Sequence, residues 1–135
     1  MNTRSYLLSI GFSLALTVFC SAAKPGWTEN FEQAQKQAVS EQKFMLLDFT
    51  GSDWCGWCIK IDKEVFAKQD FKSFSEKRLM LVELDFPQGK TLPDAVKSQN
   101  SELQRKFKVN GYPTLVLLSL REKKSPGGRD SNRLS

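Results

Sequence analysis

Two cysteines, Cys55 and Cys58, stand where an apolar strand is expected to turn into a helix, and this placement constrains the fold most strongly. Residues 44–49 form a short apolar run, typical of a strand covered on both faces, and residues 59–69 read as a helix. The first sulfur then lies at a helix N-terminus, where free N–H groups and the helix dipole favour a thiolate. The second lies one turn on, close enough to close a small disulfide ring. The sequence therefore predicts thiol–disulfide exchange.

Composition narrows the chemistry further, because the 135 residues include no histidine. Nucleophile pairs that use histidine are excluded, as are zinc sites that use imidazole. Haem attachment through Cys-x-x-Cys-His is excluded because Ile59 follows Cys58. The net charge is +5, the basic residues are scattered along the chain, and no interleaving of aromatic with basic residues suggests nucleic acid, so no nucleic-acid partner is expected. We expect one domain that needs no metal and no organic cofactor.

The first 23 residues have the order of a secretory signal. Arg4 supplies a positive start, residues 6–19 form an uncharged and mostly apolar run, and small residues follow in Ser21-Ala22-Ala23. The run is shorter than the roughly 20 residues that span a bilayer comfortably. We therefore expect a cleaved signal at 1–23 and a periplasmic or secreted protein, with an uncleaved membrane anchor as the alternative. Loss of Cys20 with the signal leaves only Cys55 and Cys58.

Strands alternate with helices over residues 24–120, which predicts an α/β domain. Residues 121–135 are polar and are expected to form a disordered tail. The expected strands are Phe44–Phe49, Leu79–Phe86 and Thr114–Leu120. The first expected helix is Thr28–Gln42, with Thr28 as its N-cap. A second runs from near Cys55 to Gln69 and places Cys58, Ile61 and Val65 on one face. A short turn or helix is expected at Phe71–Lys77, and a last helix, capped by Asn100 or Ser101, is expected to end at Phe107.

Three motifs together resemble the thioredoxin-like superfamily over residues 27–120. They are Leu47-Asp48-Phe49 at the end of a strand, Trp54-Cys55-Gly56-Trp57-Cys58, and Gly111-Tyr112-Pro113-Thr114 before a strand. The chain is also similar to secreted bacterial members and to the C-terminal domain of the periplasmic disulfide-interchange transmembrane reductase. The resemblance implies a central mixed sheet flanked by helices, with a cis-proline at Pro113 that faces the disulfide.

Roles for the sulfurs and the buried acid follow. Cys55 is the expected nucleophile that forms a mixed disulfide with a protein substrate, and Cys58 then attacks Cys55 and releases the reduced substrate. An inert structural disulfide and half of a zinc site are the alternatives. Asp48 interrupts an apolar strand, so burial should raise its pKa. The resemblance makes Asp48 the proton acceptor for Cys58, whereas a paired or half-exposed aspartate is the alternative.

Substrate contacts are expected at Trp54, Gly56, Trp57, Tyr112 and Pro113, as the resemblance implies. Both tryptophans have a simpler interpretation as packing residues, and Lys60 as a solvated surface charge. Since Gly56-Trp57 places no cation between the cysteines, the site is expected to lean towards reduction. A redox partner must then recycle it.

The final strand and final helix of the family have no counterpart before the polar tail. We therefore expect an open apolar sheet edge with low stability, or a partner that covers it. A truncated or shifted reading frame is an equal alternative. The competing function is that of a redox-silent thioredoxin-like binding module or truncated remnant.

Overall fold

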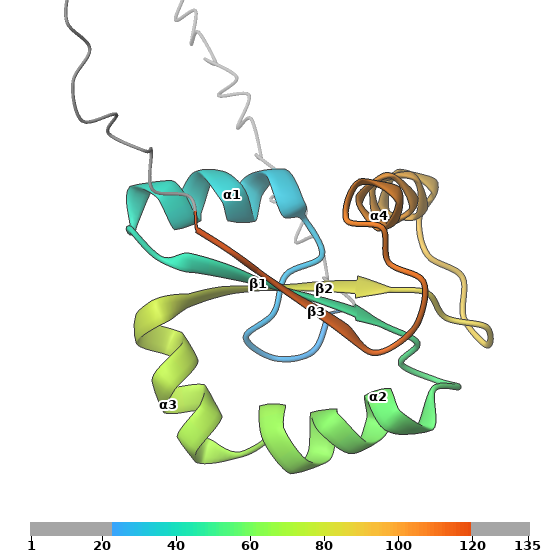
Figure 1. Ribbon diagram of the computed structural model, residues 1–135, viewed down its shortest axis with the longest axis horizontal. Coiled ribbons are helices and arrows are strands. Elements are labelled where there is room, and N and C mark those ends of the chain that lie inside the picture. Colours follow the sequence, from blue (N-terminus) through green and yellow to red (C-terminus); the bar gives the residue numbers. More distant parts are fainter. Residues whose placement is uncertain (1–22, 120–135) are drawn as a thin grey trace, which may run out of the picture.

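The protein folds around a short mixed sheet with helices on both faces (Figure 1). The computed structural model describes residues 23–119. The strand order is β2-β1-β3, with β1 parallel to β2 and antiparallel to β3. In chain order the elements are α1 (Phe31–Ser40), β1 (Phe44–Thr50), α2 (Gly56–Ile61), the π-helix η1 (Asp62–Phe66), α3 (Gln69–Arg78), β2 (Leu79–Asp85), α4 (Asp94–Lys106) and β3 (Thr114–Leu118). This arrangement confirms the predicted α/β class.

The central strand β1 alternates its side chains between two apolar layers. Met45, Leu47 and Phe49 are fully buried in the larger layer, on the side of α1 and α4. Leu46 packs against the smaller layer, on the side of η1 and α3. The buried members of the larger layer also include Ala34, Ala38, Val82, Leu84, Leu103 and Val109, and those of the smaller layer are Trp27, Phe66 and Leu81.

The register of the sheet brings polar groups together on the side of the smaller layer. Asp48 lies opposite Glu83 of β2 and Leu115 of β3. Because directly opposite residues share one face of a sheet, the Asp48 and Glu83 carboxylates are neighbours. Both are buried, as Asp48 is 1% exposed and Glu83 is 6% exposed. The face that carries these acids is the one on which the redox helix α2 lies.

Helix α1 begins later than predicted. Its N-cap is Asn30, whose side chain accepts a hydrogen bond from the Gln33 N–H at 2.9 Å. Thr28, the predicted cap, instead forms a parallel bridge with Val82, and its main-chain oxygen accepts from the Glu83 N–H at 2.9 Å. The prediction of Thr28 as N-cap was therefore wrong, because the backbone of Thr28 is engaged at the edge of β2.

Helix α4 begins earlier than predicted, at Asp94, so neither Asn100 nor Ser101 is its cap. Asn100 lies inside the helix, is 1% exposed, and donates through its side chain to the Asp85 carbonyl at 2.9 Å. An asparagine is a typical N-cap, but here its amide ties α4 to the end of β2. This use of the amide depends on tertiary packing that the local sequence does not show.

The helix after the cysteines is not one regular helix to Gln69. The chain runs from α2 into the wider turn of η1, and α3 then starts anew. Phe66 is buried, whereas Val65, which we predicted on the face of Cys58, is 42% exposed. A π-helical turn accommodates one extra residue, so it moves Phe66 to the inward position that Val65 has in a regular helix.

Strand β3 has an open outer edge within residues 23–119, where only β1 pairs with it. Leu117 is 60% exposed, and Leu115 is also exposed on the same face. Helices α2 and α3 lie on that side of the sheet, but they leave these two leucines uncovered (Figure 1). The predicted signal and the predicted polar tail lie outside the described residues, apart from Ala23.

Candidate redox site

The cysteines are held by the turn between β1 and α2. The Cys55 N–H donates to the Gly51 carbonyl at 2.9 Å, which closes the turn before the helix. Cys55 is the N-cap of α2, and its sulfur accepts a hydrogen bond from the Cys58 N–H at 3.2 Å. Cys55 and Cys58 are joined in a disulfide, with Cα atoms 5.2 Å apart. The disulfide thus lies at the start of the helix, as the sequence predicted.

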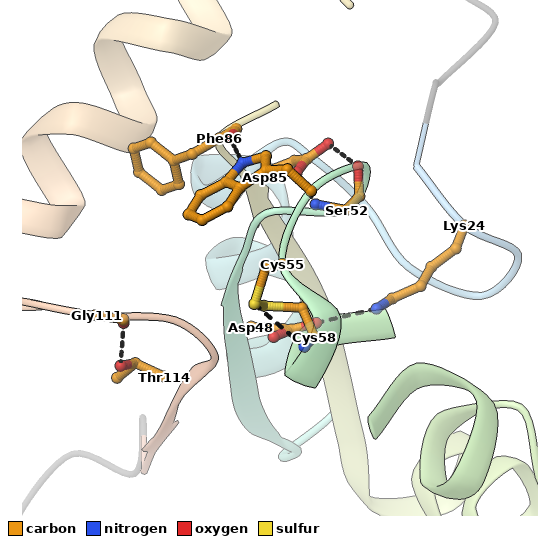
Figure 2. Close-up of a disulfide and its surroundings, with 10 residues drawn as sticks. Lys24, Asp48, Ser52, Cys55, Cys58, Asp85, Phe86, Gly111 and Thr114 are labelled. Carbon is orange, nitrogen blue, oxygen red and sulfur yellow. Dashed lines mark hydrogen bonds and ion pairs between the residues drawn. A yellow bond between two sulfur atoms is a disulfide. The ribbon is translucent and has the colours of Figure 1, made fainter. Parts of the chain in front are cut away.

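Two carboxylates, those of the buried Asp85 and the exposed Asp53, fix this turn against the end of β2 and the loop that follows it. The Asp85 carboxylate accepts from the Ser52 N–H at 2.9 Å and from the Ser52 hydroxyl at 2.6 Å (Figure 2). The Asp53 carboxylate accepts from the N–H groups of Gln88 and Gly89 at 3.0 and 2.6 Å. These two main-chain donors hold the pKa of Asp53 below its usual value. The redox turn is therefore bound to the loop that follows β2.

Trp54 packs across the turn and leaves no room for a side chain at Gly51. A Cβ atom added at Gly51 would lie 2.5 Å from the Trp54 ring. The indole N–H donates to the Phe86 carbonyl at 2.8 Å, and the ring meets Tyr112 edge-on with centroids 5.8 Å apart. Trp54 thereby joins the redox turn to the loop before β3.

The loop before β3 approaches the site through Tyr112. Its hydroxyl accepts from the Gln104 side chain at 2.7 Å, and burial raises its pKa despite this bond. The Tyr112–Pro113 peptide bond is cis. Figure 2 shows Gly111 and Thr114, which flank this bond, to the left of the disulfide.

Asp48 lies behind the disulfide, with Lys24 reaching it from the other side (Figure 2). Burial raises the pKa of Asp48, and the charge of Lys24 only partly offsets this effect. The Lys24 ammonium lies 3.0 Å from Oδ2 of Asp48. The other oxygen, Oδ1, is buried and has no hydrogen-bond partner among the described residues. The predicted burial and raised pKa are confirmed, and Asp48 is also paired.

Lys24 is the centre of a cluster of three carboxylates. Its ammonium lies 3.0 Å from Asp62 and 3.5 Å from Glu83, in addition to Asp48. The ammonium also sits over the Trp27 ring, 4.2 Å from its centroid. Burial alone would lower the pKa of Lys24, but the carboxylates raise it on balance. Burial raises the pKa of Glu83 as well. The cluster therefore contains more carboxylates than ammonium groups and is partly shielded from solvent.

A cleft of about 250 Å³ connects this cluster with the redox pair. Cys58 lines it together with Lys24, Asp62 and Glu83. The resolving sulfur and the ionic cluster thus border one polar space, which is large enough for several waters.

Comparisons with known proteins agree with this geometry. Residues 31–134 match the family described as Thioredoxin-like domain. The chain is 36% identical over 124 residues to Disulfide bond reductase DsbH of Chlamydia pneumoniae, covering 87% of this chain and 74% of that protein. This protein belongs to the thioredoxin-like family.

Three further comparisons extend this result. Thioredoxin-related protein DsbJ of Chlamydia pneumoniae is 31% identical over 97 residues, which is 72% of this chain but 28% of DsbJ. The solved DsbH oxidoreductase superposes with a TM-score of 0.67 at 36% identity, covering 82% of this chain and 76% of that one. A Thermus thermophilus thioredoxin, with a TM-score of 0.52 at 20% identity over 68% of this chain and 62% of that one, shares the fold. With its disulfide, this thioredoxin-like chain is a thiol–disulfide oxidoreductase.

The structure brings most of the predicted site residues of this thioredoxin-like protein to one place. Trp57 is 71% exposed, with the Lys60 ammonium 5.2 Å from its ring centroid. Gly56 is exposed at the first position of α2. Pro113 is half-buried in the adjoining loop. Their roles towards substrate stay predictions.

Sequence reasoning missed Lys24, Asp62 and Glu83. Glu83 gave a usable signal, since it interrupts the apolar run Leu81-Val82-Glu83-Leu84 as Asp48 interrupts β1. Lys24 gave none, because it stands 24 residues from its partner Asp48. Residues 23–119 contain no group of three or more potential ligand side chains placed to hold a metal ion. Over the same residues, no helix has the length and apolar character needed to cross a membrane.

Proposed function

We propose that this protein is exported and reduces disulfide bonds in protein substrates. The observation that carries the proposal is the Cys55–Cys58 disulfide at the start of α2, above the buried Asp48. The predicted signal at 1–23 supports export. The reducing direction is supported by the absence of a cation at Gly56 and Trp57 and by the similarity to Disulfide bond reductase DsbH.

Reduction proceeds in two exchange steps. The Cys55 thiolate attacks one sulfur of the substrate disulfide, forms a mixed disulfide, and displaces the other substrate sulfur as a thiolate. The Cys58 thiolate then attacks Cys55, which releases the second substrate sulfur and leaves the Cys55–Cys58 disulfide. A dithiol redox partner restores the cysteines by supplying two electrons and two protons.

The geometry supports this division of roles. The Cys58 N–H donates to the Cys55 sulfur at 3.2 Å, which favours negative charge on Cys55 after reduction. Cys58 is the more buried residue, at 3% exposure against 7% for Cys55. Asp48 receives the Cys58 proton through its unpartnered Oδ1, either directly or through water in the cleft.

Substrate binds along the surface that surrounds Cys55. Trp57 offers an exposed apolar ring, and Trp54 shapes the wall that it shares with Tyr112. Gly56 allows close approach because it carries no side chain, and its position is open. The Tyr112 and Pro113 main chain pairs with an extended substrate segment.

Trapping of a covalent intermediate tests the proposal. Cys58→Ser should accumulate a mixed disulfide between Cys55 and substrate proteins, detected on non-reducing gels and reversed by dithiothreitol. Cys55→Ser is the matched control and should trap nothing. The wild-type protein should also accelerate insulin reduction by dithiothreitol. No acceleration and no trapped species would reject the redox function.

Exposure of Leu115 and Leu117 favours a second role, in which a partner covers the open edge of β3. If this role were the protein's whole function, the protein would be a redox-silent binding module. The insulin assay separates the two, because a binding module needs neither cysteine.

A further inference from the structure

The main-chain nitrogen of Lys24 also contacts the ionic cluster. It donates a hydrogen bond to Oε2 of Glu83 at 3.2 Å, while the ammonium of the same residue lies 3.5 Å from Oε1. Both nitrogens of Lys24 therefore face one buried carboxylate. Glu83 is 6% exposed, so the carboxylate that accepts this hydrogen bond is buried.

The position of Lys24 is set by the residues that follow it. Trp27 is buried and its N–H donates to the Lys24 carbonyl at 3.0 Å. Thr28 then pairs with β2 through hydrogen bonds to Leu81 and Glu83 at 3.0 and 2.9 Å. Residues 24–28 thus hold Lys24 against the sheet through their own contacts.

Charge in the cluster does not balance. Asp48 from β1, Glu83 from β2 and Asp62 from η1 face a single ammonium, that of Lys24. Lys63 and Lys90 also line the cleft, but Lys90 pairs with Asp85 at 2.9 Å. Three carboxylates against one cation leave a local excess of two negative charges, in a place where burial makes charge costly.

We propose that cleavage between Ala23 and Lys24 makes Lys24 the first residue, and that its new α-ammonium group pairs with Glu83 beneath the redox site. This inference rests on the export signal of the proposed function. Hydrolysis by a signal-processing endopeptidase adds water across the Ala23–Lys24 bond, and leaves a carboxylate on Ala23 and an amine on Lys24. The amine takes up a proton near neutral pH, since its ordinary pKa is about 7.7–8.0.

Cleavage changes the electrostatics of the cluster without moving Lys24. The neutral amide N–H that now bonds to Glu83 becomes a cation with three donors, and charge-assisted hydrogen bonds are roughly twice as strong as neutral ones. The local excess falls from two negative charges to one. The new charge lowers the pKa values of Glu83 and Asp48, so processing also tunes the proton acceptor of Cys58.

The experiment compares two chains that differ by one residue. One begins at Lys24 and the other keeps Ala23, both released from an N-terminal fusion by a protease that leaves no extra residue. The α-amino group is titrated by NMR. In the Lys24 chain it should titrate about one pH unit above the ordinary range, and in the Ala23 chain within it. Glu83→Gln in the Lys24 chain should bring the pKa of the α-amino group most of the way back to the ordinary range.

The expected pH dependence has a definite sign. The α-ammonium has a raised pKa in the folded state, so its added stability is present below about pH 8 and is lost as the pH rises through the raised pKa. An α-amino group with an ordinary pKa in the Lys24 chain would overturn the inference. So would mass spectrometry of the exported protein that finds another first residue. Neither readout depends on insulin reduction, so loss of redox activity would reject only the proposed function.

Discussion

Replacement of Lys24 by methionine should destabilise the protein strongly at neutral pH. Methionine keeps an apolar stem against Trp27 but removes the cation that neutralises Asp48. The Asp48 side chain is 2% exposed and that of Lys24 is 19% exposed. Breaking a buried pair costs about 3–5 kcal/mol, and the cleft beside Lys24 gives water access, so we expect about 3 kcal/mol. For a domain of this size that lowers the Tm by roughly 12–24 °C.

The pH dependence of the loss identifies its cause. Without the Lys24 ammonium, negative charge on Asp48 and Glu83 is not compensated, whereas protonation of these carboxyls removes the need for a cation. Because burial has already raised both pKa values, the loss should shrink as the pH falls towards 4. Urea unfolding at pH 7 and pH 4 measures this difference.

Lys36→Met is the matched control for Lys24→Met. Lys36 pairs with Glu32 at 2.6 Å on the surface of α1, where both side chains are about three-quarters exposed. Surface pairs contribute little to stability, so the control should unfold within error of the wild type at both pH values. Equal losses for the two variants at pH 7, or a Lys24→Met loss that stays constant with pH, would refute the electrostatic argument.

Three further variants test the acid, the turn and the open edge. Asp48→Asn should slow insulin reduction by roughly 10²-fold or more and abolish the rise in rate that follows ionisation of Asp48; an unchanged pH–rate profile rejects proton transfer. Gly51→Ala should lower the free energy of unfolding in urea by about 1–3 kcal/mol, because the added methyl group meets the Trp54 ring. Gly56→Ala is the control and should not lower it, because Gly56 lies in open space on a helix. Equal effects of the two variants would contradict the packing argument. Leu117→Lys should remove any concentration dependence of the melting temperature, because a charge at the edge of β3 opposes self-association. A wild-type melt that is already sharp, monomeric and independent of concentration argues against self-association through this edge.

The sequence predicted those parts of the site that local pattern determines. A cysteine pair between an apolar strand and a helix required the disulfide to lie at the start of α2. A carboxylate inside an apolar strand required a buried Asp48 with a raised pKa. In both cases the periodicity of the chain determines the environment of the side chain, so neighbours in the sequence are sufficient.

Local pattern was misleading where tertiary contacts decide the outcome. Asn100 has the chemistry of a helix cap, but its amide bonds to the Asp85 carbonyl inside α4. The wider turn of η1 reverses the burial of Val65 and Phe66, and no residue type marks that turn in the sequence. Lys24 lies outside every helix and strand, so periodicity could not assign it to the redox site.

The position of Lys24 gives the N-terminal segment a chemical role. The sheet alone places Asp48 beside Glu83, and two neighbouring buried carboxylates repel one another. Their repulsion raises the pKa of Asp48 and so disfavours the charged form that accepts the proton of Cys58. A cation 3.0 Å from Asp48 counters this effect, and it comes from a segment that lies outside every helix and strand. A chain shortened to begin at Trp27 should therefore lose stability as Lys24→Met does, and its Asp48 should titrate at a higher pH than in the longer chain.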